Sequence, residues 1–102
     1  MSSPHPSVLP FADLVVVELG SSVAAPFAGQ ILGELGAQII KIEDRDEGDS
    51  VRHGPGDPAL KKDGLAATFV MFNAGKKSVT LDLKKPEAKA IIMKLARSSD
   101  VL

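Results

Sequence analysis

The 102-residue sequence contains no cysteine, which excludes disulfide bonds and thiolate chemistry. It has no excess of positive charge, because twelve Lys and Arg oppose thirteen Asp and Glu, and aromatic residues make up only 4%. No basic stripe with interleaved aromatics occurs, so nucleic acid is not an expected partner. No apolar run approaches the ~20 residues that span a bilayer, and the first ten residues do not resemble a signal peptide. These absences predict a soluble, cytoplasmic protein without membrane contact.

The composition is otherwise that of a globular chain, with 44% hydrophobic and 25% charged residues. This length allows one domain with a hydrophobic core. Residues 1–10 carry three prolines and three serines and are predicted to be a disordered tail. Residues 11–102 are predicted to form the domain.

The segment from residue 14 to residue 43 predicts a strand, a helix and a second strand. Leu14–Leu19 is an apolar, β-branched run that is typical of a strand buried on both faces, and Gln38–Glu43 is the second such run. This order indicates a right-handed crossover unit of a parallel sheet. The turn after the first strand of such a unit, next to a helix N-terminus, is where these sheets bind anions and nucleotides.

The intervening helix is predicted to include Pro26 in its first turn, with the hydroxyls of Ser21–Ser22 available to cap it. Apolar residues recur along this helix at Phe27, Ile31 and Leu35, and Ala28 and Leu32 widen that stripe. Gly29 and Gly33 would let the helix approach the sheet closely. Gly36 is expected to end it in a left-handed turn.

The rest of the chain predicts a further crossover. Residues 44–64 are rich in charge, glycine and proline and indicate a long loop. Leu65–Phe72 favours a short helix, Ser78–Leu83 a third strand, and Pro86 the start of another helix. Val101–Leu102 is typical of the first residues of a further strand. The predicted fold class is α/β: a Rossmann-like parallel sheet of at least three strands with flanking helices, incomplete at its C-terminal end.

Sequence motifs exclude several kinds of site. The turn after the first strand keeps only Gly20 of a dinucleotide fingerprint, and Glu43 alone matches the ribose-binding acid, so NAD is disfavoured. A phosphate loop fails because Lys77 follows Gly75 and Lys76. No nucleophile elbow is present, and the two histidines have no second metal ligand nearby, so no metal is expected.

Two clusters of charge remain to be interpreted. The acidic cluster is expected to be a solvated loop and comprises Glu43, Asp44, Asp46, Glu47 and Asp49. The lysines that flank the third strand are Lys76, Lys77, Lys84 and Lys85. Solubility and protection of the sheet edge are the favoured interpretation of these lysines. The alternative is that some of them hold phosphates as point charges.

Three segments, taken in order, resemble the N-terminal region of the family III CoA-transferases, which include formyl-CoA transferase and carnitine CoA-transferase. The segments are Leu14–Pro26, Leu35–Glu43 followed by Gly48-Asp49, and Phe72–Lys84. Lys85–Glu87 and Ser99–Leu102 continue the match. The resemblance covers most of this chain but only the opening part of a family member.

The resemblance implies an enzyme that moves CoA from an acyl-CoA to a carboxylic acid. An aspartate of the family attacks the thioester and forms an aspartyl-CoA intermediate, which is covalent catalysis. That aspartate is expected beyond Leu102, so the chain would contain no catalytic residue. Residues 11–102 would be a partial Rossmann-like CoA-binding domain of a homodimer. CoA and acyl-CoA would be substrates, with no permanently bound cofactor.

The resemblance also implies which residues contact CoA. These are Val23, Ala24, Arg45, Leu81, Asp82, Leu83 and Lys84. Val23 stands where some transferases have glutamine, and Asp44 stands where many have arginine, which leaves Arg45 as the nearest arginine. Asn73 and Lys76 match the transferase branch.

Two alternatives stay open. One is a relative of the α-methylacyl-CoA racemases, which share the fold. The other is a non-catalytic nucleotide-binding or self-associating module. The chain alone is predicted to bind CoA weakly, to lack transferase activity, and to self-associate through exposed apolar sheet.

Overall fold

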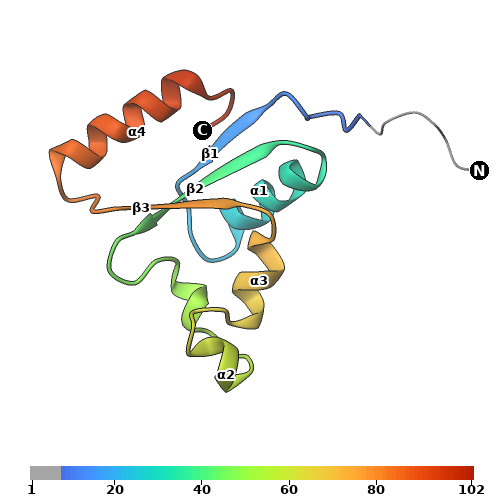
Figure 1. The fold of residues 1–102 in the computed structure, drawn as a ribbon, viewed down its shortest axis with the longest axis vertical. Helices are drawn as coiled ribbons and strands as arrows, with labels where there is room; N and C mark the ends of the chain where they lie inside the picture. Colours follow the sequence, from blue (N-terminus) through green and yellow to red (C-terminus); the bar gives the residue numbers. More distant parts are fainter. Residues whose placement is uncertain (1–7) are drawn as a thin grey trace, which may run out of the picture.

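Three parallel strands form one sheet in the order β1–β2–β3 within residues 8–102, which are the residues that this computed structural model describes. The elements are β1 (Val15–Glu18), α1 (Ala24–Glu34), β2 (Gln38–Asp44), η1 (Ser50–His53), α2 (Pro58–Lys61), α3 (Ala67–Asn73), β3 (Lys77–Leu81) and α4 (Pro86–Ser98). The predicted α/β class, with a parallel sheet and flanking helices, is confirmed (Figure 1). Residues 1–7 of the predicted tail lie outside the described residues.

The strand pairing shows where the chain turns back on itself. Val17 of β1 pairs with Ile40 of β2, so the first two strands are adjacent and parallel as predicted. After α4, Val101 forms a parallel bridge with Val16, and the Val17 N–H donates to the Val101 carbonyl at 2.9 Å. Val101 therefore pairs with the outer edge of β1, at the place where the sequence predicted a further strand.

The direction of the crossovers places the helices on two faces of the sheet. The steps from β1 to β2 and from β2 to β3 run the same way, so right-handed crossovers put α1 and α3 on one face. The return to Val101 runs the opposite way, and the same rule puts α4 on the other face. Figure 1 shows α1 and α3 next to each other and α4 apart from both.

The face of the sheet toward α1 changes character along the strands. Alternate side chains of β2 share a face, which groups Ile39, Lys41 and Glu43. Ile39 belongs to the apolar core with Val16, at the amino end. Lys41 and Glu43 are equally buried but charged, at the carboxyl end. Between the sheet and α1, the half at the amino end of the strands is thus held by apolar packing and the half at the carboxyl end by ionic contacts.

The apolar stripe of α1 does not all face the sheet. Leu32 packs against the core of Val16 and Ile39, but Phe27 and Ile31 are 50% and 44% exposed. Pro26 and Gly29 are the buried residues of the helix, and a Cβ at Gly29 would overlap the carboxylate of Glu18. The helix therefore turns its glycine side toward the sheet, which confirms the predicted close approach.

The outward face of α1 is partly covered by α3. The rings of Phe27 and Phe72 meet edge to face with their centroids 5.7 Å apart. Ile31 and the next stripe position, Leu35, are 44% and 37% exposed. The apolar spacing therefore predicted the helix correctly, while the stripe itself is divided between the sheet side, where Leu32 packs, and the outward side.

The two ends of α1 differ in how well they were predicted. Val23 occupies the N-cap position without a side-chain hydrogen bond, so the predicted capping by Ser21–Ser22 is wrong. Gly36 has a φ of +112°, which confirms the predicted left-handed turn at the other end. The serines miss the capping position because Ser22 is hydrogen-bonded to the loop after β2 instead.

The predicted long loop of residues 44–64 contains two short helices. Asp49 begins η1 by accepting the Val51 N–H, and Asp57 begins α2 by accepting the Ala59 N–H. These aspartates are ordinary N-caps, a role that their position before short helices allows. The helix predicted at residues 65–72 is confirmed as α3.

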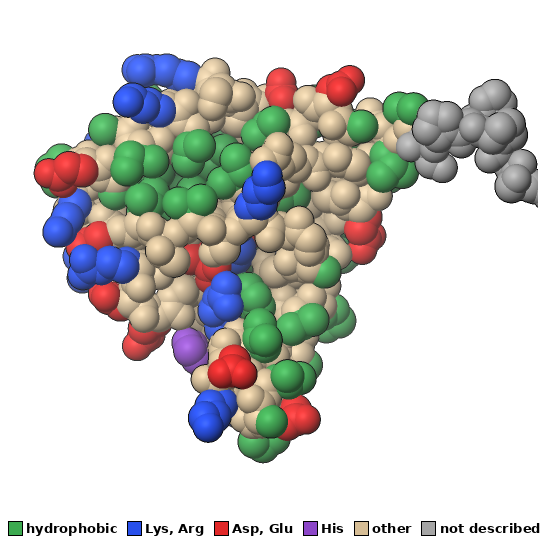
Figure 2. Space-filling view, viewed as in Figure 1, with side chains coloured by type: hydrophobic (Ala, Val, Ile, Leu, Met, Phe, Trp, Pro, Cys, Tyr) green, Lys and Arg blue, Asp and Glu red, His purple; other side chains and the backbone are tan. Residues whose placement is uncertain are grey.

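Hydrophobic side chains remain at the surface. Figure 2 shows a group of them on the face that carries α4. Ile91 and Met93 of α4 are 43% and 47% exposed, and Leu102 is 67% exposed. Apolar surface of this kind is the physical basis of the predicted self-association.

Alanine at Gly36 should destabilise the fold more than alanine at Gly75. Both glycines have left-handed φ values, which cost a residue with a Cβ about 1–2 kcal/mol. A Cβ at Gly36 would also lie 2.7 Å from the Leu9 Cβ and 3.0 Å from the Ala12 nitrogen, whereas a Cβ at Gly75 meets nothing. Urea denaturation of Gly36→Ala and Gly75→Ala measures the difference. Equal losses would contradict the crowding at Gly36.

Candidate functional site

The carboxyl ends of the parallel strands define the candidate site. In sheets of this kind, ligands bind beyond these ends, at the point where the strand order reverses. Here β2 lies on one side of β1 and Val101 lies on the other, so the reversal falls at the carboxyl end of β1. The turn between β1 and α1 starts at that point.

Two cavities adjoin this turn. The larger one has a volume of about 410 Å³, lies between β1, α1 and residues 101–102, and is mostly apolar. The smaller one has a volume of about 170 Å³ and extends from the turn across the end of β2 to Leu83. Leu19 and Gly20 line both cavities. The turn thus separates an apolar space from a polar one.

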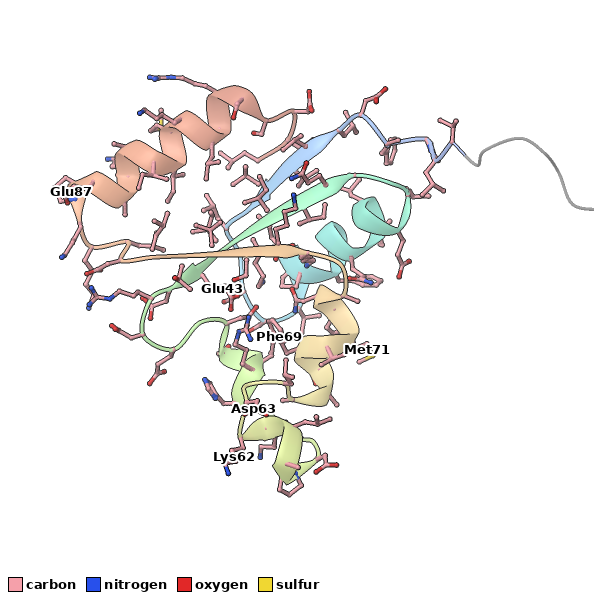
Figure 3. All side chains as sticks on the ribbon, in the orientation of Figure 1. Glu43, Lys62, Asp63, Phe69, Met71 and Glu87 are labelled. Atoms are coloured by element: carbon pink, nitrogen blue, oxygen red, sulfur yellow. The ribbon has the colours of Figure 1, made fainter. Side chains whose placement is uncertain are left out.

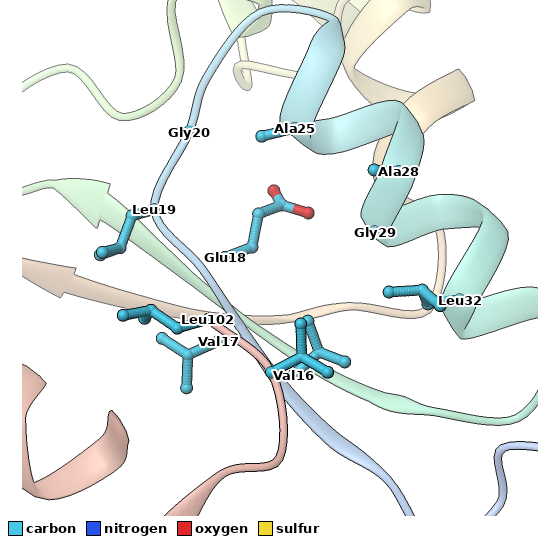
Figure 4. A pocket seen from close by; sticks show the side chains of 11 residues that line it. Val16, Val17, Glu18, Leu19, Gly20, Ala25, Ala28, Gly29, Leu32 and Leu102 are labelled. Atoms are coloured by element: carbon cyan, nitrogen blue, oxygen red, sulfur yellow. The ribbon is translucent and has the colours of Figure 1, made fainter. Parts of the chain in front are cut away.

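Among residues 8–102, Glu18 carries the one charged side chain that lines the larger cavity. Figure 4 shows its carboxylate pointing from β1 toward α1, with Ala25 and Gly29 on the opposite wall. Glu18 is 5% exposed. Its two oxygens lie 2.7 Å from the ammonium groups of Lys41 and Lys76. The carboxylate is therefore neutralised by the protein itself.

Lys41 is the centre of a buried ionic network. Its side chain is 1% exposed, and its ammonium lies 2.7 Å from Glu18 and 2.9 Å from Asp49. Burial by itself would raise the pKa of Asp49, but Lys41 and the N–H groups of Ser22 and Val51 lower it below its usual value. Asp49 is therefore ionised at neutral pH and bridges the loop after β2 to the turn after β1.

Lys76 is the second buried cation of the network. Its ammonium donates to Glu18 at 2.7 Å, and to the Pro26 carbonyl and the Asn73 side-chain oxygen at 2.9 Å each. Burial lowers the pKa of Lys76, while the hydrogen bond and charge of Glu18 oppose that effect. The interpretation of Lys76 as a surface lysine is wrong. Lys76 joins α1, α3 and β1, and Asn73 assists it.

Glu43 anchors the outer part of the network. Both its oxygens lie 2.7 Å from the Arg52 guanidinium, and the Ser78 hydroxyl and the Asp49 N–H also donate to it. The guanidinium stacks 3.8 Å above the Phe69 ring, and Figure 3 shows Glu43 on β2 and Phe69 on α3. Burial by itself would raise the pKa of Glu43, but these hydrogen bonds and the charge of Arg52 lower it to about 2.

These contacts correct the interpretation of the acidic cluster as a solvated loop. Glu43 and Asp49 are 3% and 2% exposed, and both accept hydrogen bonds from the protein. Glu43 is therefore not free to hold a ribose. The sequence did carry a signal for this pairing, because Lys41 and Glu43 alternate with the isoleucines of β2. Charges in a buried strand are normally paired, so these two residues indicated ion pairs.

The predicted contacts of the first turn lie at the start of α1. Val23 is its N-cap residue and Ala24 its first residue. Both are exposed, and Phe27 donates its N–H to the Val23 carbonyl at 2.7 Å. Neither side chain carries a polar group, so these residues offer a ligand only backbone atoms and apolar contact.

The predicted contacts after β2 and β3 lie side by side. The Arg45 N–H donates to the Leu81 carbonyl at 3.2 Å, and its guanidinium lies 3.8 Å from Asp82. The Arg45 side chain is 57% exposed. Leu83 lines the smaller cavity, and Lys84 is exposed beside it in the chain. Of the predicted contacts, Leu83 alone lines either cavity in the described part of the chain.

No arrangement of three or more His, Cys, Asp or Glu side chains within residues 8–102 is suited to a metal ion. His53 is exposed, and one of its ring nitrogens lies 3.1 Å from the Glu47 carbonyl oxygen. No helix in the same range is long and apolar enough to cross a membrane.

Comparison with known proteins gives consistent matches. The family described as CoA-transferase family III matches residues 11–102. A succinate–glutarate CoA-transferase from Agrobacterium fabrum is 39% identical over 97 residues, which cover 91% of this chain and 24% of the relative. The β subunit of a succinyl-CoA–L-malate CoA-transferase from Chloroflexus aurantiacus is 38% identical over 96 residues, covering 94% of this chain and 23% of the relative.

A solved structure also matches. The crystal structure of a hypothetical protein from Mycobacterium tuberculosis superposes with a TM-score of 0.78 at 37% identity. The match covers 92% of this chain and 25% of that structure. This chain therefore spans about a quarter of the length of the relatives that it matches.

The stability of the protein should fall as the pH falls from about 5 to 2. Glu43 has a pKa of about 2 when folded, against an ordinary value of 4.5, so its stabilising effect is complete above pH 4.5 and is lost as the pH falls through 2. Glu43→Gln should flatten this part of the profile, which chemical denaturation at a series of pH values measures. Asp46→Asn, at an exposed site, is the control. A profile that Glu43→Gln leaves unchanged would contradict the assignment.

Proposed function

Because the chain belongs to CoA-transferase family III, we propose that it supplies the CoA-binding part of an enzyme that transfers CoA from an acyl-CoA to a carboxylic acid. Relatives named for succinate, glutarate and malate support a CoA thioester as donor and a carboxylate as acceptor. CoA is a substrate in this proposal and not a resident cofactor.

The observation that carries the proposal is the pair of cavities at the reversal of strand order. The predicted contacts flank them: Val23 and Ala24 follow the turn that lines both, and Leu83 lines the smaller one. The apolar space between β1 and α1 suits the pantetheine arm. The exposed cations Arg45 and Lys84 suit the phosphates, which lysine binds as a point charge.

The chemical step requires a carboxylate that can attack a thioester. In the proposed mechanism an aspartate attacks the thioester carbonyl and releases the CoA thiolate, which leaves a mixed anhydride. The thiolate then attacks the aspartyl carbonyl, releasing the donor carboxylate and leaving an aspartyl-CoA thioester, and the acceptor carboxylate repeats these steps in reverse. The buried carboxylates Glu18, Glu43 and Asp49 are each held by cations and hydrogen bonds, so they are poor nucleophiles. By the family resemblance, the nucleophile is expected outside these 102 residues.

The same proposal includes a partner subunit. A homodimer would cover hydrophobic side chains that are exposed here, including Phe27 and Ile31 of α1 and Ile91 of α4. The relative named as a β subunit makes pairing with a different chain the alternative.

The isolated chain should bind CoA more tightly than NAD or ATP in calorimetric titrations. Lys84→Ala should weaken CoA binding by about two- to fivefold, the usual range for an exposed charge pair. Lys89→Ala, on the exposed surface of α4, is the matched control and should leave the affinity unchanged. Equal binding of all three nucleotides, or none, would refute the proposal.

The isolated chain should show no turnover of acyl-CoA with carboxylate acceptors, because the proposed nucleophile is not among its residues. Release and capture of CoA can be followed by chromatography of the thioesters. Turnover by the purified chain would place the nucleophile within the 102 residues and would contradict the proposed mechanism.

A further inference from the structure

Asp49 connects two segments that are far apart in the sequence. One of its carboxylate oxygens accepts the N–H of Ser22, in the turn after β1, at 3.0 Å. The same oxygen accepts the Val51 N–H at 3.1 Å, and the other oxygen lies 2.9 Å from the Lys41 ammonium. Asp49 is 2% exposed, so these contacts are shielded from water.

The residue that Asp49 holds has an unusual backbone conformation. Ser22 has a φ of +67°, and it is the only residue other than glycine with a positive φ in the described range, 8–102. This conformation is unfavourable for a residue with a Cβ unless its surroundings impose it. The imposing contacts are the Asp49 carboxylate and the Ser50 hydroxyl, which lies 3.2 Å from the Ser22 hydroxyl.

The conformation of Ser22 determines where α1 begins. Ser22 directly precedes Val23, the N-cap residue, and Ala24, the first residue of the helix. These two are predicted CoA contacts that have only backbone and apolar atoms to offer. Their contribution to binding therefore depends on the path of the backbone, and the left-handed residue before them sets that path.

Asp49 itself has little freedom to move. Its N–H donates to Glu43 at 2.8 Å, and Lys41, which holds its second oxygen, is in turn held by Glu18. Asp49 is thus held at its backbone N–H by Glu43 and at its second carboxylate oxygen by Lys41. A group that imposes an unfavourable conformation on another segment must itself be held in place in this way.

We propose that Asp49 is a positioning residue, which holds Ser22 in the left-handed conformation and thereby shapes the turn between β1 and α1 for CoA. This role rests on the proposed function, because the proposed function is what gives the turn a ligand, CoA. Asp49 touches no CoA itself in this proposal and acts through Ser22.

Asp49→Asn is a sharp test because an amide has only one oxygen. A carboxylate can accept from the Ser22 N–H and face Lys41 at the same time, whereas an asparagine that turns its oxygen to Lys41 presents an NH₂ group to the Ser22 N–H. The shape of the side chain is preserved, and in this orientation the hydrogen bond to the turn is lost. Asp49→Ala, which has no side-chain oxygen, removes that hydrogen bond in any orientation and is measured beside it. The left-handed conformation can be followed by NMR through the amide–Hα cross-peak within Ser22, which is strong only at positive φ.

In Asp49→Asn, the Ser22 cross-peak should weaken and the CoA dissociation constant should rise about tenfold, the effect expected from releasing one strained residue. The double variant Asp49→Asn/Ser22→Gly should regain most of the affinity, since glycine adopts positive φ without support. Ile39→Ala, in the core at the amino end of the sheet, is the control. It should lower stability but leave the CoA affinity of the folded protein and the Ser22 cross-peak unchanged.

Each outcome decides the matter. A strong Ser22 cross-peak in both Asp49→Asn and Asp49→Ala would overturn the positioning role whether or not CoA binds. A weakened cross-peak with unchanged affinity, or no recovery in the double variant, would overturn the link between the turn and CoA. Absence of CoA binding by the unsubstituted chain would refute the proposed function and this link together. That result is seen without any variant, so it can be told apart from a failure of the positioning role alone.

Discussion

The structure depends on the pairing of Lys41 with two buried carboxylates. Glu18 and Asp49 come from different segments, and Lys41 lies between them. Without Lys41, Glu18 would keep Lys76, but the buried charge of Asp49 would lose the cation that faces it. Removing one partner of a buried pair typically costs about 3–5 kcal/mol, although such a pair adds little net stability over apolar packing. Its contribution is to specify one arrangement, because a strand register shifted by one residue would move Lys41 to the opposite face.

This arrangement places the proposed site. The amino half of the layer between the sheet and α1 is apolar, with Gly33 next to Ile39, whereas Gly29 lies against the Glu18 carboxylate in the carboxyl half. That carboxyl half is ionic: Asp49 ties the loop after β2 to the turn after β1, and Lys76, which follows α3, is hydrogen-bonded to the Pro26 carbonyl of α1. The strand order reverses at the carboxyl end of β1, with β2 on one side and Val101 on the other. The turn that follows β1 therefore borders a cavity on each side. The charged side chains that surround the turn hold the backbone in place and are not themselves free to bind a ligand.

The sequence predicted the order and type of the main elements, because their patterns are local. The β-branched runs, the left-handed Gly36 and the helix before β3 depend on neighbouring residues alone. The sequence predicted the close approach of α1 through its glycines, but its apolar stripe did not show that Phe27 and Ile31 would stay exposed while Leu32 packs on the sheet. It also failed for Lys76 and Asp49, whose partners lie 58 and 27 residues away. Charges near loops normally indicate solvent, and only the fold shows that these are paired. The predicted CoA contacts came from the family resemblance and stay predictions.

The most direct measurement of the central claim is a map of backbone amide shifts during a titration of the isolated chain with CoA. The account predicts that the largest changes fall at residues 19–24 and 81–84, at the carboxyl edge of the sheet, while the exposed side of α4 is unaffected. Changes centred on α4, or no changes at millimolar CoA, would contradict it.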